Sequence, residues 1–302
     1  MWETSMTVLC ATDFSTNSQA AIRLAADLAR RTGRSLLLTH AVDLAADDQA
    51  WRVLVEAPDE IEKSAGEQAA TRLETFFEES VDAALRPKLV RFEVGMGSPA
   101  EVILELAEKE ATALVVVGTR GASRLREIFL GSVANSLVRQ SEVPVLLAPP
   151  ETANGAFKTI VVGLDLSPVS GAVLRRAATL AREQDASVHV VHALIVPEVT
   201  GLAMSLNEPA SRLPELRSQR HAQLKELIVE EGAEDVVDEV QIIVDAPDRA
   251  LVDYAANIKA DLIAMGTRGR RGWARFFLGN SAERTMRRAR CPVFVVPIGK
   301  DD

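Results

Sequence analysis

The chain has 302 residues, of which 47% are hydrophobic and 25% are charged, and its net charge is −9. This length exceeds what one hydrophobic core usually supports, so we expect two domains of a globular protein rather than a disordered chain. The acidic balance argues against non-specific binding to nucleic acid or to an anionic membrane, because both need a basic surface. With no apolar run near the roughly 20 residues that span a bilayer and no signal-peptide pattern, we expect a cytoplasmic protein.

The two cysteines are far apart in the sequence. Cys10 and Cys291 form neither a CxxC pair nor a Cys/His metal-binding spacing, so neither a disulfide framework nor a zinc site is indicated. Both lie in apolar, strand-like segments, where a free cysteine usually behaves as a small hydrophobic residue. We therefore expect two buried thiols.

The first half of the chain alternates strands and helices. Continuous Val and Leu runs separated by helical patterns indicate a parallel sheet covered by helices on both faces. Gly33 is placed to end the first helix and Pro99 to begin the third. We expect strands at Thr7–Ala11, Ser35–His40, Leu89–Val94, Ala113–Val117 and Pro144–Leu147. Helices are expected at Thr16–Arg31, Pro99–Glu110 and Ser132–Gln140, and a further helix is expected to include Phe77 and to end before Pro87.

The second half repeats the first. We expect domains at residues 1–150 and 151–302, because the segment around Pro149–Gly155 has the Pro, Asn and Gly content of a linker. Strands are expected at Ile160–Gly163, Val188–His192, Val240–Val244, Leu262–Met265 and Val293–Val296. The matched pairs are Asp13 with Asp165 and His40 with His192, 152 residues apart, and Pro99 with Pro247, Gly118 with Gly266 and Pro144 with Pro292, 148 residues apart.

The loop after the fourth strand of each copy is the candidate phosphate site. It reads Gly118-Thr119-Arg120-Gly121, then nine residues, then Gly131-Ser132 before a helix. Glycine allows close approach of a ligand to the main chain, Ser132 is placed to cap the helix, and a helix N-terminus favours an anion. An ordinary turn with solvated arginines is the alternative for one such loop, but repetition with identical spacing favours binding. The basic residues are Arg120, Arg124 and Arg126 in the first loop and Arg268, Arg270, Arg271 and Arg275 in the second.

Other nucleotide-binding motifs are absent from the sequence. It contains no GxxxxGK[ST], and the first strand of each copy leads into Thr12-Asp13-Phe14 or Leu164-Asp165-Leu166 rather than GxGxxG. Neither a P-loop nor a dinucleotide fingerprint is therefore present, and hydride transfer is not expected.

Two matched pairs of polar residues allow more than one interpretation. Asp13 and Asp165 follow the first strand of each copy, where a carboxylate could bind adenine, ribose or a cation, or could cap the next helix. His40 and His192 end apolar strands, but no nucleophile or acidic partner accompanies them. We expect packed or hydrogen-bonded strand-end histidines.

Several of these motifs together resemble the universal stress protein family. They are Thr12-Asp13-Phe14-Ser15, Leu38-Thr39-His40-Ala41-Val42, Gly97-Ser98-Pro99, Val117-Gly118-Thr119-Arg120-Gly121, Gly131-Ser132-Val133 and Val143-Pro144-Val145. The resemblance covers both copies and implies an α/β fold of two tandem Rossmann-like domains, each a five-stranded parallel sheet with helices on both faces. It also implies ATP binding and the pairing of domains through the last strand.

The resemblance assigns a ligand role to individual residues. In the first copy Asp13, the main chain of Ala41 and Val117 would adjoin adenine and ribose. The residues around the phosphates would be Gly118, Arg120, Gly121, Gly131, Ser132 and Val133. The second copy has Asp165, Ala193, Met265, Gly266, Arg268, Gly269, Gly279, Asn280 and Ser281 at the matching places, and its Asn280 replaces the hydroxyl residue of the pattern.

The leading hypothesis is an ATP-binding regulatory or stress-response protein without clear catalysis, which binds ATP with or without Mg²⁺. The alternatives are an interaction module of the same fold that binds no nucleotide, and a slow ATPase. The apolar final strands favour an internal pseudo-dimer of the two copies, because each would otherwise expose a sheet edge. Whether two chains form a homodimer stays open.

Overall fold

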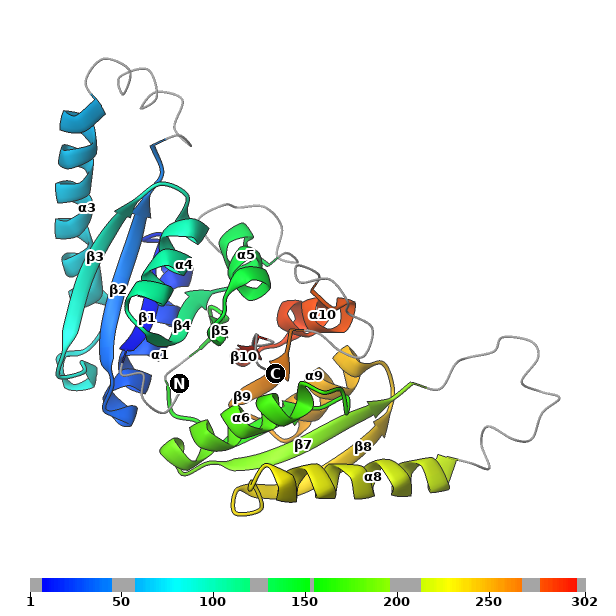
Figure 1. Cartoon of the computed structure of the whole chain (residues 1–302). Coiled ribbons are helices and arrows are strands. Elements are labelled where there is room, and N and C mark those ends of the chain that lie inside the picture. The colour runs from blue at the N-terminus through cyan, green and yellow to red at the C-terminus, as the bar shows by residue number, and fades with distance from the viewer. Residues whose placement is uncertain are drawn as a thin grey trace. The chain divides into compact units, whose positions relative to one another are not determined.

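The computed structural model describes residues 7–44, 58–119, 130–152, 155–195, 213–267 and 278–297. The strands predicted in the first repeat are confirmed with bounds that shift by one or two residues (Figure 1). In chain order its elements are β1 (Thr7–Ala11), α1 (Thr16–Thr32), β2 (Ser35–Val42), α3 (Pro58–Ser80), the 3₁₀ helix η2 (Ala83–Leu85), β3 (Val90–Met96), α4 (Pro99–Lys109), β4 (Thr112–Gly118), α5 (Ser132–Gln140) and β5 (Val145–Ala148).

The second repeat has the same order of elements, so the sequence repeat is also a structural one. Its elements are β6 (Thr159–Gly163), α6 (Ser170–Gln184), β7 (Ser187–Leu194), α8 (Leu213–Glu230), β8 (Val237–Val244), α9 (Pro247–Asn257), β9 (Leu262–Gly266), α10 (Asn280–Arg288) and β10 (Val293–Val296).

The chain divides into two compact units. The first consists of Met1–Ala156 with Arg290–Pro297, and the second of Phe157–Ala289 with Ile298–Asp302. The last strand of the second repeat, β10, thus belongs to the first unit. The boundary at residues 150 and 151 stays a prediction about where the two domains separate.

The sheet of the first unit has the strand order β3-β2-β1-β4-β5-β10. Strands β1 to β5 run parallel, as expected for strands joined by helical crossovers. Strand β10 pairs antiparallel with β5, with Phe294 opposite Leu146, and both side chains are fully buried. This pairing covers the edge of β5 that would otherwise expose backbone donors and acceptors.

Two pairs of helices cover the sheet of the first unit. Helix α1 packs on β1, β2 and β4 and against α3, whereas α4 packs on β2, β3 and β4 and against α5. Helix α1 ends as predicted at Gly33, whose φ of 68° is left-handed and whose N–H bonds to Ala29. Pro99 occupies the first turn of α4, also as predicted. Because helices lie on both faces, β1 is buried on both faces, which explains its unbroken apolar sequence.

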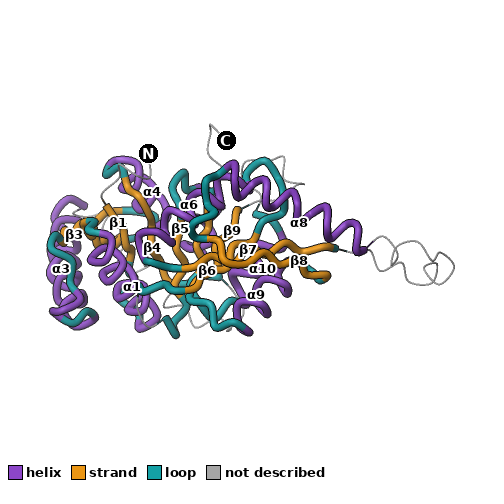
Figure 2. Tube along the Cα trace, turned by 90° about the horizontal axis from the view of Figure 1, so that it is seen from below, coloured by secondary structure: helices purple, strands orange, loops and turns teal. Residues whose placement is uncertain are grey.

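The second unit contains the parallel strands β9-β6-β7-β8 in that order. Helix α8 packs on β8 and helix α9 packs on β7, and Figure 2 shows the two helices on opposite sides of these strands. The mostly parallel sheet with helices on both faces confirms the predicted α/β architecture of each repeat.

The two cysteines differ in their surroundings. Cys10 on β1 is fully buried, and this burial raises the pKa of its thiol far above the ordinary range. Cys291 is half-buried. The expectation of a buried thiol is therefore confirmed for Cys10 and wrong for Cys291, which precedes β10 rather than lying within it.

Candidate functional site

The candidate site of each repeat lies where the direction of strand addition reverses. In the first unit β2 and β4 flank β1, so the chain leaves β1 on one side and returns on the other. Cys10 on β1 lies opposite Val116 on β4, which brings the segments that follow these two residues to the same edge of the sheet. In open α/β sheets ligands bind at this carboxyl edge, next to the reversal.

Asp13 lies at this edge, two residues beyond the end of β1. Its Oδ1 atom accepts hydrogen bonds from the backbone N–H of Ser15 at 3.0 Å and from the Ser15 hydroxyl at 2.6 Å. The N-cap of α1 is Ser15 itself, whose side chain accepts the N–H of Ser18. The alternative that Asp13 caps the helix is therefore wrong. Its exposed carboxylate instead orders the turn that follows β1.

Asp165 occupies the matching place in the second unit with different partners. Its Oδ1 atom accepts the backbone N–H of Ser167 at 3.0 Å and the hydroxyl of Ser170 at 3.2 Å. The N-cap of α6 is Val169, so the capping alternative is wrong here too. Both aspartates thus order the loop between strand and helix.

The strand-end histidines join neighbouring strands. The Nδ1 atom of His40 lies 2.8 Å from the carbonyl oxygen of Thr12, and the Nδ1 atom of His192 lies 2.7 Å from that of Leu164. Because a carbonyl oxygen only accepts, each neutral imidazole carries its proton on Nδ1. Burial, followed by the nearby charge of Arg72, lowers the pKa of His40, against opposing effects of the Thr12 carbonyl and Asp13. The prediction of hydrogen-bonded strand-end histidines is confirmed.

Ala41 and Ala193 follow these histidines on β2 and β7. Ala41 pairs with Gly95 on β3, and Ala193 pairs with Ile243 on β8. Both alanines are partly exposed near the carboxyl ends of their strands. Their main chains therefore lie at the same edge of the sheet as the aspartates.

The glycine loop begins at the end of the fourth strand of each repeat. Val117 and Met265 are buried within β4 and β9, and Gly118 and Gly266 end these strands. Beyond the strand, the N–H of Gly131 donates to the Thr119 carbonyl at 2.9 Å. The N–H of Gly279 donates to the Thr267 carbonyl at 3.1 Å. Each bond ties the two ends of the loop together and sets the following helix at the carboxyl end of the strand.

The start of α5 differs in one detail from the prediction. The N-cap is Gly131, with φ −57° and ψ 151°, and no side chain caps the helix. Ser132 is the first helical residue rather than the cap, because the bond from Gly131 to Thr119 places the turn into the helix one residue earlier. The hydroxyl of Ser132 is exposed, with Val133 partly exposed beside it. A first helical turn directs its N–H groups outward without intrahelical partners and favours an anion.

Helix α10 begins in the same way in the second unit. Its N-cap is Gly279, again without a side-chain cap, followed by Asn280 and Ser281. Glu283 lies in its first turn, whereas the first turn of α5 has no acidic residue. A carboxylate there opposes the binding of an anion, so the second repeat is the less favourable one for phosphate on two counts, Asn280 and Glu283.

Nine of the residues named in the two predicted loops lie outside the described part of the chain. They are Arg120, Gly121, Arg124 and Arg126 in the first loop and Arg268, Gly269, Arg270, Arg271 and Arg275 in the second. The structure brings the remaining predicted residues to the carboxyl edges of the two units. The aspartates follow the central strands β1 and β6, the alanines lie on the neighbouring strands β2 and β7, and the glycine loops begin at β4 and β9 on the opposite side. Their roles toward a ligand stay predictions.

Thr12 and Phe14 also lie at the first edge and were not predicted as site residues. The carbonyl oxygen of Thr12 accepts the hydrogen bond from His40. The Thr12 hydroxyl lies 2.8 Å from the Ser18 hydroxyl and accepts the N–H of Phe14 at 3.1 Å. Phe14 has a φ of 59°, and Leu166 in the second repeat has 58°. A positive φ at a large non-glycine residue is uncommon, and only the identical position of both residues after Asp could have drawn attention to it.

Within the described residues, no group of three or more His, Cys, Asp or Glu side chains is placed to hold a metal ion. The same part of the chain has no helix long and apolar enough to cross a membrane.

The comparisons with known proteins agree with the architecture. The model of the universal stress protein family matches residues 5–149 and 156–297. A universal stress protein of Mycobacterium tuberculosis is 28% identical over 295 residues, covering 95% of this chain and 96% of the relative. One from Methanocaldococcus jannaschii is 32% identical over 176 residues, covering 54% of this chain and 89% of the relative.

A solved structure agrees in fold along the whole chain. A universal stress protein from Archaeoglobus fulgidus superposes with a TM-score of 0.67 and 24% identity, covering 98% of this chain and 100% of that one. Both repeats are matched by the family model, and the full-length relative has the same tandem extent. The chain belongs to the universal stress protein family and carries two of its domains in tandem.

Proposed function

We propose that this chain binds ATP at the carboxyl edge of its repeats. The bound ATP regulates a stress-response function, and ATP hydrolysis is not required for it. The observation that carries the proposal is the closure of each glycine loop by the bonds from Gly131 to Thr119 and from Gly279 to Thr267. These bonds hold the start of a helix beside the strand reversal, where a triphosphate would meet the amides of the first turn. The aspartate and alanine at the neighbouring strands then adjoin adenine and ribose.

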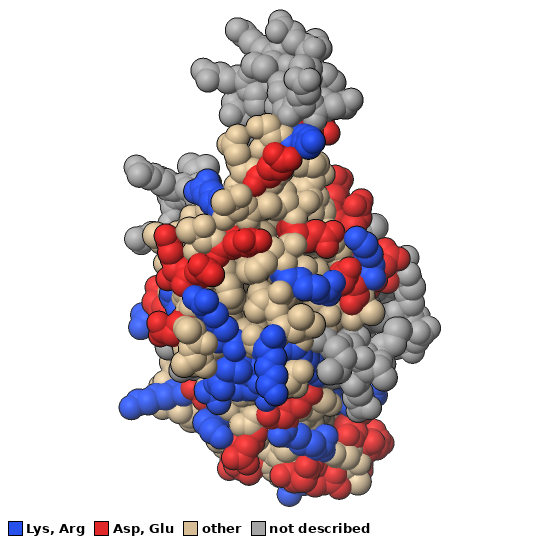
Figure 3. Space-filling view, turned by 90° about the vertical axis from the view of Figure 1, so that its left-hand side faces the viewer, with Lys and Arg blue, Asp and Glu red and all other residues tan. Residues whose placement is uncertain are grey.

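The surface charge supports a local phosphate site rather than a general polyanion site. The net charge is −9, and on the face in Figure 3 acidic side chains are interspersed with the basic ones. Counterion release from nucleic acid needs an extended basic surface. We therefore propose a cytoplasmic protein whose ligand is an adenine nucleotide and whose partners include neither nucleic acid nor membrane.

The two repeats would form an internal pseudo-dimer. The antiparallel pairing of β5 with β10 supports this part of the proposal, since the two strands are the last of their repeats. Association of two chains into a homodimer is a separate question that sedimentation at several concentrations answers.

The direct test is thermal unfolding with millimolar ATP and Mg²⁺. A ligand present at 100 times its Kd stabilises the native state by about 2.7 kcal/mol, so a clear rise in Tm is expected. Gly131→Leu places a side chain at the N-cap of α5 and should remove the part of the rise that comes from the first repeat. Gly66→Leu on α3, where a Cβ has no neighbour within 4 Å, is the matched control and should retain it.

An unchanged Tm in the wild type would overturn ATP binding and favour the alternative of an interaction module. Nucleotide released from purified, denatured protein would exclude that module. A slow ATPase is the remaining alternative, and steady ADP release that is lost in Asp13→Ala would favour it over the proposal.

A further inference from the structure

Arg72, Phe14 and His40 form a stack in the first unit, beside Asp13. The guanidinium carbon of Arg72 on α3 lies 4.2 Å from the centre of the Phe14 ring. The Phe14 ring also contacts His40, with ring centres 4.2 Å apart and planes inclined by 38°. Arg72 is exposed, whereas Phe14 and His40 are half-buried, so the stack leads from the strand ends to solvent.

The Phe14 ring is held from several elements. The backbone N–H of Phe14 donates to the Thr12 hydroxyl at 3.1 Å. Phe76 on α3 meets the Phe14 ring edge-on, with ring centres 5.5 Å apart. His40 is fixed in turn by its bond to the Thr12 carbonyl. Phe14 is therefore a preorganised aromatic surface at the end of β1, where ordering it on binding costs little further entropy.

The second repeat keeps the histidine bridge but lacks the stack. His192 bonds to Leu164 as His40 bonds to Thr12, yet Leu166 stands where the first repeat has Phe14. The buried pairs Leu73 with Leu224 and Phe77 with Ile228 align α3 with α8, which places Gln223 at the position of Arg72. Gln223 accepts a bond from Arg220 of its own helix. The fold thus needs the bridge, whereas the cation and the aromatic ring are particular to the first repeat.

A planar guanidinium on an aromatic ring is a surface on which a nucleobase stacks, and stacking tolerates every base because each has a π-face. Asp13 beside it adds a carboxylate that can accept the amino group of adenine. We propose that Arg72, supported by Phe14, binds the base of a nucleotide in the first repeat, which therefore binds the nucleotide more tightly than the second repeat does. This inference rests on the proposed function, since it assigns the base end of the same site.

The second repeat's own differences point the same way. Asn280 replaces the hydroxyl of Ser132, and Glu283 adds a negative charge to the first turn of α10. The hydroxyl of Ser167 in the loop after β6 is buried and has no hydrogen-bond partner, whereas its counterpart Ser15 both donates to Asp13 and caps α1. The second repeat is therefore less suited than the first to bind either the base or the phosphates of a nucleotide.

The test is calorimetric titration of the full chain with ATP and, separately, with inorganic tripolyphosphate, which has no base. We expect one tight and one weaker class of ATP site. Phe14→Leu and Arg72→Gln, which introduce the second repeat's residues, should each weaken the tight class about tenfold and leave tripolyphosphate binding within twofold. Arg72→Lys should behave like Arg72→Gln, because an ammonium keeps the charge but not the plane. Gln223→Ala should leave the tight class unchanged.

Three results would overturn the inference. An Arg72→Gln loss that is equal for ATP and tripolyphosphate would make Arg72 a phosphate contact. Unchanged ATP affinity in both Phe14→Leu and Arg72→Gln would show that the stack is only structural. Two equivalent ATP sites in the wild type would remove the proposed difference between repeats. Each of these leaves the proposed function intact, whereas absence of any ATP binding to the wild type would overturn the proposed function as well. Circular dichroism of every variant confirms that it folds.

Discussion

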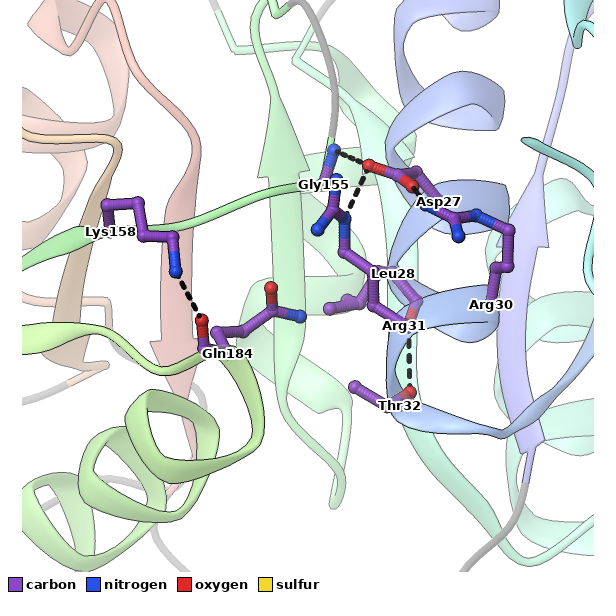
Figure 4. Close-up of polar contacts among 8 residues, drawn as sticks. All are labelled: Asp27, Leu28, Arg30, Arg31, Thr32, Gly155, Lys158 and Gln184. Carbon is purple, nitrogen blue, oxygen red and sulfur yellow. Dashed lines mark hydrogen bonds and ion pairs between the residues drawn. The ribbon is translucent and has the colours of Figure 1, made fainter. Parts of the chain in front are cut away.

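The carboxylate of Asp27 accepts the backbone N–H of Gly155 at 3.2 Å, although 128 residues separate them in the chain (Figure 4). Asp27 lies on α1 and is 1% exposed, and its side chain also binds Arg30 at 2.6 Å and Arg31 at 2.9 Å. Gly155 lies in the link between the repeats, one residue before Ala156, where this part of the first unit ends. One buried carboxylate thus fastens the link to the first helix, and Thr179 stands at the matching position of the second repeat.

Replacing Asp27 by Asn should destabilise the first unit. The variant keeps an acceptor for Gly155 but loses two charge-assisted bonds, so we expect a loss of about 1–3 kcal/mol in the free energy of unfolding. The side chains of Arg30 and Arg31 are each 36% exposed and can regain water, which keeps the loss below that of a fully buried pair. Urea unfolding at pH 7 measures it, and a difference under 0.5 kcal/mol, about the size of an ordinary surface change, would contradict the fastening role.

The same carboxylate predicts a pH dependence. Burial alone would raise the pKa of Asp27, but the bonds from Arg31 and Arg30, the charge of Arg31 and the Gly155 N–H together lower it. A carboxyl group with a lower pKa in the folded state contributes its full stabilisation of the fold at pH values above its pKa in the unfolded chain, about 3.9. This contribution is lost as the pH falls through the pKa of the folded state. Wild type and Asp27→Asn should therefore converge in stability below about pH 4. A difference that grows on acidification would show the sign to be wrong.

Gly155 should not tolerate a side chain. A Cβ there would lie 2.7 Å from the Leu28 nitrogen and 2.8 Å from the Leu24 carbonyl oxygen, both backbone atoms of α1. Gly155→Ala should therefore cost about 1–3 kcal/mol, as overpacking does elsewhere. The control is Gly66→Ala within α3, where a Cβ meets nothing within 4 Å and alanine should stabilise by about 0.5–1 kcal/mol. Equal effects of the two changes on urea unfolding would refute the close packing.

His40 should destabilise the fold on mild acidification. Burial and Arg72 lower its pKa below the ordinary value, so the folded state resists the proton that the unfolded chain takes up near pH 6.5. This contribution is present above about pH 6.5 and is lost as the pH falls from there. Urea unfolding between pH 7.5 and 5 should show a steeper loss in the wild type than in His40→Gln. The imidazole resonances, followed by NMR, should titrate below the ordinary value in the wild type and higher in Arg72→Gln.

Asp248 should stabilise the second unit through the pair of helices α9 and α10. It is 3% exposed and lies 3.0 Å from a guanidinium nitrogen of Arg288 and 3.8 Å from one of Arg284. Asp248→Ala removes both interactions, and we expect a loss of about 1–3 kcal/mol, since breaking a buried charged bond costs more than a surface change. The exposed Asp253 on the same helix is the matched control, and its change to Ala should stay within about 0.5 kcal/mol. Thermal unfolding that ranks the two alike would exclude the helix-pairing role.

Two local details of the site could not be predicted from the sequence: the role of Asp13 and the contact of Arg72 with Phe14. Asp13 and Ser15 are both good N-cap residues, and the sequence offered the carboxylate either role. The left-handed φ of Phe14 turns the chain so that the helix begins after Ser15 and Asp13 faces the turn instead. Arg72 lies on α3, 58 residues after Phe14 in the chain, and no local sequence pattern ties it to Phe14. Such contacts join residues about 60 positions apart and depend on how α3 packs on the sheet.

The sequence by itself determined the repeat, the order of strands and helices, the place of the glycine loops and the family, because apolar periodicity and glycine spacing are properties of neighbouring residues. The resemblance to the family implied pairing through the last strands, and the tertiary structure added that β5 and β10 run antiparallel with Phe294 opposite Leu146. Only the tertiary structure decided that Asp27 holds Gly155 and that Arg72 rests on Phe14. The reason is that the burial of a charge, the close packing of a glycine on a helix or the stacking of two side chains arises from surfaces that meet after folding, and a linear pattern carries no distance between them.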